Sequence, residues 1–217
     1  ARPQSLVLKV DAANTACEDV LAIAKVAVME FLEDSNATAR HINEVEMMEK
    51  EKCYLYVDHS NIASSGLHIR AEEVHELVLG PREARDRHLV GSYAGSGQNE
   101  DTWVAWRDLG YQVHVCQRPE GVGEQFVDDA LIAQMLGALS RHIGQDNSDK
   151  TLILLSGDGN DNAGRSSFAS VIQSAIFDYK WNVEVWCWKH SCAALYHHLQ
   201  EIAPDQMSVR YLDVLRD

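Results

Sequence analysis

Apolar and polar residues follow a regular order along most of this chain. From residue 53, short runs rich in Val, Ile, Leu and aromatic residues predict strands. Each run is followed by a stretch with apolar residues at three- or four-residue steps, which predicts a helix. The predicted strands are 53–58, 88–94, 111–117, 151–157, 182–188 and 209–214. The predicted helices are 67–79, 99–109, 127–142, 166–180 and 193–202.

This alternation of strands and helices is typical of a parallel sheet with helices on both faces. The run TLILLSG at 151–157 is almost continuously apolar, as expected for a central strand that is buried on both sides. We therefore expect residues 52–217 to form one three-layer α/β/α domain with a mainly parallel central sheet.

The first 51 residues lie outside this alternation. Residues 5–10 are predicted to form a short strand or an extended arm, and residues 12–34 and 40–51 have helical patterns. We interpret 1–51 as a helical extension packed on the domain. The alternative is a docking arm for a protein partner or for a second copy of the chain.

The amino-acid composition limits the kinds of molecule that the chain is expected to bind and the cell compartment in which it is expected. The chain has 217 residues and a formal net charge of -14, which is unfavourable for general binding to nucleic acid. This charge leaves room for a local basic strip, or for an acidic centre at which a metal ion meets phosphate. Five cysteines without a CxxC pair are expected to be reduced, which favours a cytoplasmic or nuclear location. No run is long enough to span a membrane, and the first residues lack the apolar core of a signal peptide.

Carboxylates follow three of the apolar runs. Asp58 ends the first strand, Asp128 and Asp129 open the helix at 127–142, and Asp158 follows the central strand with Asp161 close behind. In an α/β fold, strand C-termini and the adjacent helix starts share one edge of the sheet. Acidic groups gathered there repel one another unless a hard cation lies among them, so the pattern predicts a magnesium site.

Each of these three acidic positions also has an explanation that involves neither a metal ion nor catalysis. Asp58 alone is better explained as a helix N-cap, and the macrodipole favours Asp128 or Asp129 in the first turn of a helix. The sequence SGDGND around Asp158 is also a common turn. The prediction of a site depends on all three lying at one edge.

The same residues resemble the NYN domain, a branch of the PIN-like nuclease superfamily, in its eukaryotic and particularly fungal form. The resemblance covers roughly 52–217. The matching stretches are VDHSNI at 57–62, GSYAGSGQNEDTWVAWRDLGYQVHV at 91–115, FVDDALIAQML at 126–136 and LILLSGDGN at 152–160.

The resemblance implies a PIN-like fold and a metal-dependent ribonuclease, specifically an endonuclease, that uses Mg²⁺ or Mn²⁺. The positions that match the catalytic acids of the family are Asp58, Asp128, Asp129 and Asp158, and the same four with Asp161 are the implied metal ligands. Many members carry an extra acid two residues after the main one, where this chain has Asn160. One or two bound ions would activate a water and stabilise the leaving oxygen, which gives 5′-phosphate and 3′-hydroxyl products.

The expected substrate is single-stranded RNA. Ser60, Asn61 and Asn160 are predicted to contact it or to orient a bound water. The predicted basic strip consists of Arg82, Arg85, Arg87, Arg118 and Arg165. Because Glu83 and Asp86 interleave with the first three arginines, a solvated loop explains 81–88 equally well. Trp103 and Trp106 are expected in the core, although tryptophans can also stack on bases.

Of three alternative classes, the first two each require a residue that this chain lacks. A haloacid-dehalogenase-type phosphatase needs Asp-x-Asp after its first strand, where this chain has Asp58, His59 and Ser60. A von Willebrand A-type binding module needs a serine at position 62, which is Ile62. The third alternative is an NYN domain that binds RNA or protein but has lost catalysis.

Overall fold

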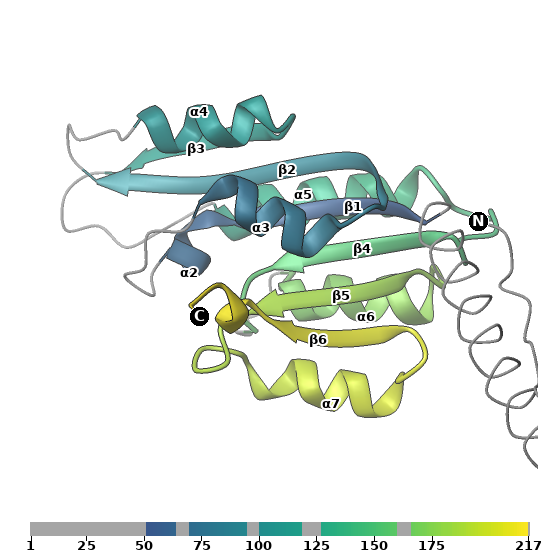
Figure 1. The fold of residues 1–217 in the computed structure, drawn as a ribbon. Coiled ribbons are helices and arrows are strands. Elements are labelled where there is room, and N and C mark those ends of the chain that lie inside the picture. The colour runs from purple at the N-terminus through teal and green to yellow at the C-terminus, as the bar shows by residue number, and fades with distance from the viewer. Residues whose placement is uncertain (1–50, 64–69, 95–99, 119–126, 160–165, 217) are drawn as a thin grey trace, which may run out of the picture. The chain divides into compact units, whose positions relative to one another are not determined.

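The computed structural model describes residues 51–63, 70–94, 100–118, 127–159 and 166–216, which form an α/β domain (Figure 1). The helical extension predicted for 1–51 lies outside the described residues, except for Glu51. The strands are β1 (Lys52–Asp58), β2 (Glu83–Ala94), β3 (Gln112–Arg118), β4 (Lys150–Leu155), β5 (Asn182–Cys187) and β6 (Met207–Tyr211). The helices are α2 (His59–Ala63), α3 (Ala71–Leu79), α4 (Glu100–Asp108), α5 (Val127–Ser140), α6 (Phe168–Phe177), α7 (Ala194–Ile202) and the 3₁₀ helix η1 (Leu212–Arg216).

The strands form one sheet in the order β3-β2-β1-β4-β5-β6, and every neighbouring pair is parallel. The chain starts at a central strand, moves outward through β2 to β3, and then returns to pair β4 on the other side of β1. The order therefore reverses its direction between β1 and β4. All the strands end at the same edge of the sheet, called here the carboxyl edge.

Alternation along the strands divides the core into two layers. On β1, Tyr54 and Tyr56 face a cluster that includes residues of α5, α6 and α7. Leu55 and Val57 face the other cluster, which includes residues of α2, α3, α4 and η1. The central strand β4 is buried along its whole length, as its apolar run predicted. The expected three-layer α/β/α fold is confirmed, and in Figure 1 the helices cover both faces of the sheet.

Two strand boundaries differ from the prediction by more than two residues. β2 begins at Glu83 rather than at residue 88, because its charged first half pairs with the start of β1 in the register Lys52↔Glu83. The interpretation of 81–88 as a loop is therefore wrong for most of its length. β6 ends at Tyr211, opposite the last residue of β5, and the chain then turns into η1.

The tryptophans of α4 are core residues, as expected. Trp103 is 4% exposed and Trp106 is 1% exposed, and both pack in the cluster on the α3 and α4 side. Among the described helices, none combines the length and the apolar character needed to cross a lipid bilayer.

Candidate functional site

Asp58 lies at the carboxyl edge with both carboxylate oxygens engaged. Its Oδ1 accepts a hydrogen bond from the Asn61 N–H (3.0 Å), which caps the short helix α2. Its Oδ2 accepts from the Ser156 hydroxyl (3.0 Å). The residue is only 4% exposed. The helix-cap interpretation is thus correct for one oxygen, while the second oxygen faces the neighbouring strand β4.

Ser156 joins the ends of β1 and β4. Its hydroxyl oxygen donates to Asp58 and also accepts from the Asp158 N–H (3.2 Å). Beside this link, the Gly157 N–H donates to the Asn61 side-chain oxygen (2.8 Å). The structure therefore ties Asp58 and Asn61 to the backbone that carries Asp158, although the two segments are 96 to 98 positions apart.

The turn after β4 packs directly against the loop between β5 and α7. The Ala193 N–H donates to the Gly157 carbonyl (3.0 Å). A Cβ atom on Gly157 would lie 2.4 Å from the Ser191 carbonyl oxygen, and one on Gly159 would lie 2.6 Å from the Ala193 Cβ. Glycine is therefore required at both positions by close approach of the two segments.

Tyr196 of α7 holds the backbone of Asp158. Its hydroxyl donates to the Asp158 carbonyl oxygen. Burial raises the pKa of Tyr196 well above its usual value, and the negative charge of Asp158 raises it further, so the hydroxyl stays protonated and remains a donor. Neither Ser156 nor Tyr196 was among the predicted site residues, because their hydrogen bonds to the Asp158 backbone arise only in the folded chain.

The other predicted acids are placed as follows. Asp128 and Asp129 lie half-buried in the first turn of α5, which packs on β1 and β2. Since α5 returns the chain from the end of β3 to the start of β4, its first turn belongs to the carboxyl edge. Asp161 lies outside the described residues, as do Asn160 and Arg165.

The described ranges contain no group of three or more His, Cys, Asp or Glu side chains placed to hold a metal ion. Asp58 and Asp158 remain as a pair at the ends of adjacent strands, where the Asp58 carboxylate and the Asp158 backbone N–H bind the same Ser156 hydroxyl. Magnesium is commonly held by one or two carboxylates together with waters and substrate phosphates. The pair fits such an open site rather than a closed protein cage.

The predicted basic strip is not brought to this edge. Arg82 precedes β2 at the amino edge, where it is 8% exposed and forms a two-pronged ion pair with Glu184 (2.8 and 3.1 Å). Arg85 pairs with Glu83 (3.0 Å), and Arg87 donates to the Leu109 carbonyl. The structure corrects the placement of these three arginines. Their side chains are engaged before β2 or along its first half, and not at the strand ends beside Asp58.

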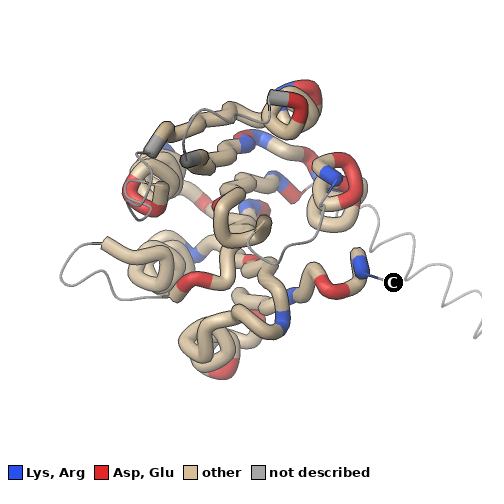
Figure 2. The backbone as a smooth tube through the Cα atoms, turned by 90° about the vertical axis from the view of Figure 1, so that its left-hand side faces the viewer, with Lys and Arg blue, Asp and Glu red and all other residues tan. Residues whose placement is uncertain are grey.

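Two other predicted substrate contacts lie at the carboxyl edge. Arg118 is the last residue of β3. Ser60 accepts a hydrogen bond from the Ser92 N–H (3.3 Å), which ties α2 to β2. The loop after β5 adds two exposed basic residues that the sequence analysis left unassigned to a substrate, Lys189 and His190. Figure 2 looks onto this edge and shows both acidic and basic segments there.

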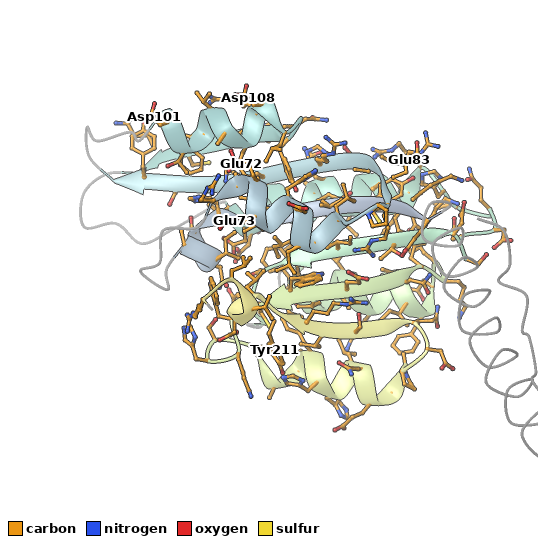
Figure 3. The ribbon with its side chains drawn as sticks, viewed as in Figure 1. Glu72, Glu73, Glu83, Asp101, Asp108 and Tyr211 are labelled. Carbon is orange, nitrogen blue, oxygen red and sulfur yellow. The ribbon has the colours of Figure 1, made fainter. Side chains whose placement is uncertain are left out.

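Much of the acidic surface lies on helices. Glu72 and Glu73 of α3 and Asp101 and Asp108 of α4 are exposed and extend outward from the sheet (Figure 3). These solvated side chains account for part of the net charge of -14 without any ligand.

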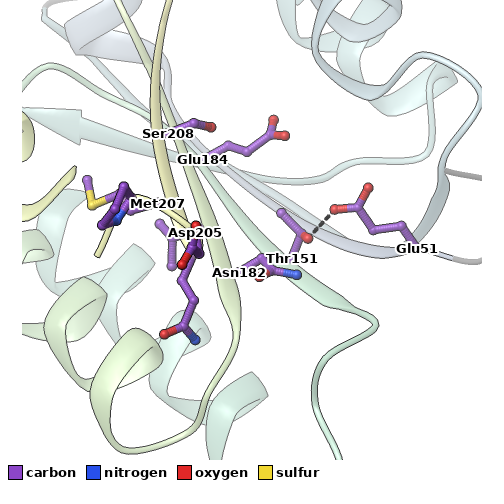
Figure 4. Close-up of a pocket in the computed structure, with 10 residues that line it drawn as sticks. Glu51, Thr151, Asn182, Glu184, Asp205, Met207 and Ser208 are labelled. Carbon is purple, nitrogen blue, oxygen red and sulfur yellow. Dashed lines mark hydrogen bonds between the residues drawn. The ribbon is translucent and has the colours of Figure 1, made fainter. Parts of the chain in front are cut away.

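A polar pocket lies at the amino edge, far along the strands from Asp58. It encloses about 130 Å³ (Figure 4). Its lining consists of Glu51, residues at the starts of β4, β5 and β6, and the turn before β6. Glu51 accepts a hydrogen bond from Thr151 at its rim. Small-molecule sites usually enclose about 300 Å³ or more, so this pocket is too small for a typical ligand.

No protein-family model matches the chain, and no curated protein sequence matches it. Among solved structures, the chain is similar to the crystal structure of a protein of unknown function from Vibrio parahaemolyticus, with a TM-score of 0.51 and 17% sequence identity. The match covers 76% of this chain and 94% of that chain. At this level of identity the likeness supports the fold alone.

Proposed function

We propose that this chain is a metal-dependent ribonuclease whose centre is the Asp58–Ser156–Asp158 junction. One observation supports the proposal: the Asp58 carboxylate and the Asp158 backbone, at the ends of adjacent strands, bind the same Ser156 hydroxyl where the strand order reverses. In open α/β sheets, ligands bind outside the carboxyl ends of the strands at this reversal. A dinucleotide is less well supported there, since the turn after β1 reads DHSNIA and contains no glycine.

Asp58 and Asp158 would hold a Mg²⁺ or Mn²⁺ ion, with Asp129 of α5 as a further carboxylate at the same edge. Such an ion lowers the pKa of a bound water and neutralises charge on a phosphate. Ser156 fixes the orientation of the Asp58 carboxylate, and Asn61 and Tyr196 hold the backbone on either side of Asp158. Lys189 and His190, which are exposed in the loop after β5, would contact the phosphates of a single-stranded RNA in place of the arginines before and within β2.

The test is cleavage of an end-labelled single-stranded RNA by the purified chain in Mg²⁺ or Mn²⁺, with EDTA as the blank. We expect metal-dependent fragments that carry 5′-phosphates. Asp58→Asn and Asp158→Asn keep the shape and part of the hydrogen bonding, and each is expected to reduce the rate at least 100-fold. The matched control is Asp108→Asn, because Asp108 is exposed at the far end of α4.

Full activity in both variants, with unchanged thermal unfolding, would refute the assignment. The alternative function is that of an NYN-like domain that has lost catalysis. In that alternative the domain binds RNA without cleaving it. Retention of the RNA on a filter in EDTA, with no fragments in either metal, would support the binding module over the enzyme.

A further inference from the structure

Two cysteines lie on the same side of the sheet, next to the loop that covers Gly157. Cys187 is the last residue of β5 and is fully buried. Cys192 follows five positions later, half-buried, in the turn before α7. Both carry free thiols.

Side-chain direction and local contacts bring these thiols together. Cys187 follows Val183 and Val185 in the alternation of β5, and both valines belong to the core cluster on the α7 side. Cys192 packs against that same cluster. The turn between them is closed by the Ser191 N–H, which donates to the Trp188 carbonyl (3.0 Å) and so brings Cys192 back beside the end of β5. Each sulfur also lies near a carbonyl oxygen, 3.9 Å for Cys187 to Arg210 and 4.0 Å for Cys192 to Ala193.

The two thiols differ in reactivity. The neighbouring Cys187 thiol lowers the pKa of Cys192, whereas the neighbouring Cys192 and burial raise the pKa of Cys187. The thiolate is the reactive form of cysteine, so the more accessible Cys192 is the better nucleophile. By contrast, burial raises the pKa of Cys53 to about 12, which keeps that thiol inert.

We propose that Cys187 and Cys192 form a reversible intramolecular disulfide in the presence of a hydroperoxide. The Cys192 thiolate attacks one peroxide oxygen of H₂O₂, the O–O bond breaks, and the leaving hydroxide takes up the thiol proton as water. The sulfur of Cys187 then attacks the resulting sulfenic sulfur, and the displaced hydroxide leaves as a second water with the Cys187 proton. Two thiols lose two electrons, and the peroxide gains them.

The bond would act on the turn that carries Asp158. Closing a sulfur–sulfur bond of about 2.05 Å draws Cys192 toward the end of β5. The residues beside Cys192 hold that turn, through the Ser191 carbonyl packed on Gly157 and the Ala193 N–H bonded to the Gly157 carbonyl. Oxidation therefore changes the loop that supports the candidate centre, whatever reaction the centre performs.

The sequence provides a direct test because Lys189 separates the two cysteines. Trypsin cleaves after Lys180, Lys189 and Arg210, which puts Cys187 in peptide 181–189 and Cys192 in peptide 190–210. The reduced full chain is treated with H₂O₂, its remaining thiols are alkylated, and the digest is mapped by mass spectrometry. We expect the two peptides as one linked species that dithiothreitol separates.

Cys192→Ser should abolish the linked species, and Cys116→Ser, which changes a thiol on the edge strand β3, should leave it unchanged. The proposal is overturned if both peptides remain alkylated after peroxide treatment. It is equally overturned if Cys192 accumulates only as sulfinic acid, or if either cysteine links to Cys17 or Cys116 instead. The assay on the unmodified chain decides these outcomes even if a variant folds poorly.

Discussion

Replacing Gly157 with alanine tests the contact between the turn after β4 and the loop after β5. The new Cβ would lie 2.4 Å from the Ser191 carbonyl oxygen, at least 0.6 Å inside the 3.0 Å below which Cβ atoms essentially never approach. The obstacle is backbone, so no side chain can rotate away. The two segments must separate, which strains or breaks the hydrogen bonds of Gly157 to Ala193 and Asn61.

Overpacking of this kind costs about 1–3 kcal/mol, and the two weakened but not lost hydrogen bonds together add about 1 kcal/mol. We therefore expect Gly157→Ala to lower the free energy of unfolding by about 2–4 kcal/mol. For a domain of this size the corresponding fall in Tm is roughly 5–15 °C. Thermal and urea unfolding followed by circular dichroism give both quantities.

Gly137→Ala is the matched control with the opposite sign. Gly137 lies inside α5, and the nearest atom to its added Cβ is the mobile end of Arg141 at 3.8 Å. Alanine in a helix interior is favoured over glycine by about 0.5–1 kcal/mol, so this variant should be slightly more stable. If Gly157→Ala is as stable as the parent, or if both variants shift in the same direction, the described packing of the two loops is wrong.

Two further predictions concern single side chains. Tyr196→Phe removes the hydrogen-bond donor to the Asp158 carbonyl and should lower the free energy of unfolding in urea by about 1–2 kcal/mol. The control Tyr211→Phe loses only a 3.5 Å contact to His197 and should change the free energy of unfolding by under about 0.5 kcal/mol. Equal effects of the two variants would contradict the role of Tyr196. Burial lowers the pKa of His75 below 6.5, so the unfolded chain binds that proton more readily and stability falls as the pH drops through about 6.5. His75→Gln should flatten this pH dependence of the free energy of unfolding. An unchanged slope would show that His75 is not the group responsible.

The layers and the order of elements were predictable because apolar periodicity is a local property. β4 is the clearest example, since a continuous apolar run has few alternatives to a strand buried on both faces. The start of β2 was not predictable in the same way. Asp86 and His88 are tolerated in that strand because they pair with each other (2.8 Å), and Arg141 binds Asp86 (2.9 Å) from 55 positions away.

The candidate site was also predictable only where it depends on local sequence. Asp58 and Asp158 were predictable because each follows an apolar run that forms a strand. The parallel sheet then brings the ends of these two strands together. The partners that fix them, Ser156 and Tyr196, come from hydrogen-bond geometry that the sequence does not encode locally. The error at Arg82 has the same origin, because its partner Glu184 is 102 positions away on β5. The assignment of Asp128, Asp129 and Asp161 as ligands stays a prediction.

The hydrogen bond between Asp58 and Ser156 also has a kinetic consequence. It spans 98 positions, and the chain between them forms β2 and β3 on the far side of β1. Parallel pairings of such high contact order are slow to form, because a large loop must close before any native contact compensates for the lost entropy. During synthesis, Asp58 therefore emerges long before its partner does. A nascent chain that ends before β4 would contain Asp58 but neither Ser156 nor Asp158, so the Asp58 carboxylate would lack the hydrogen bond that orients it.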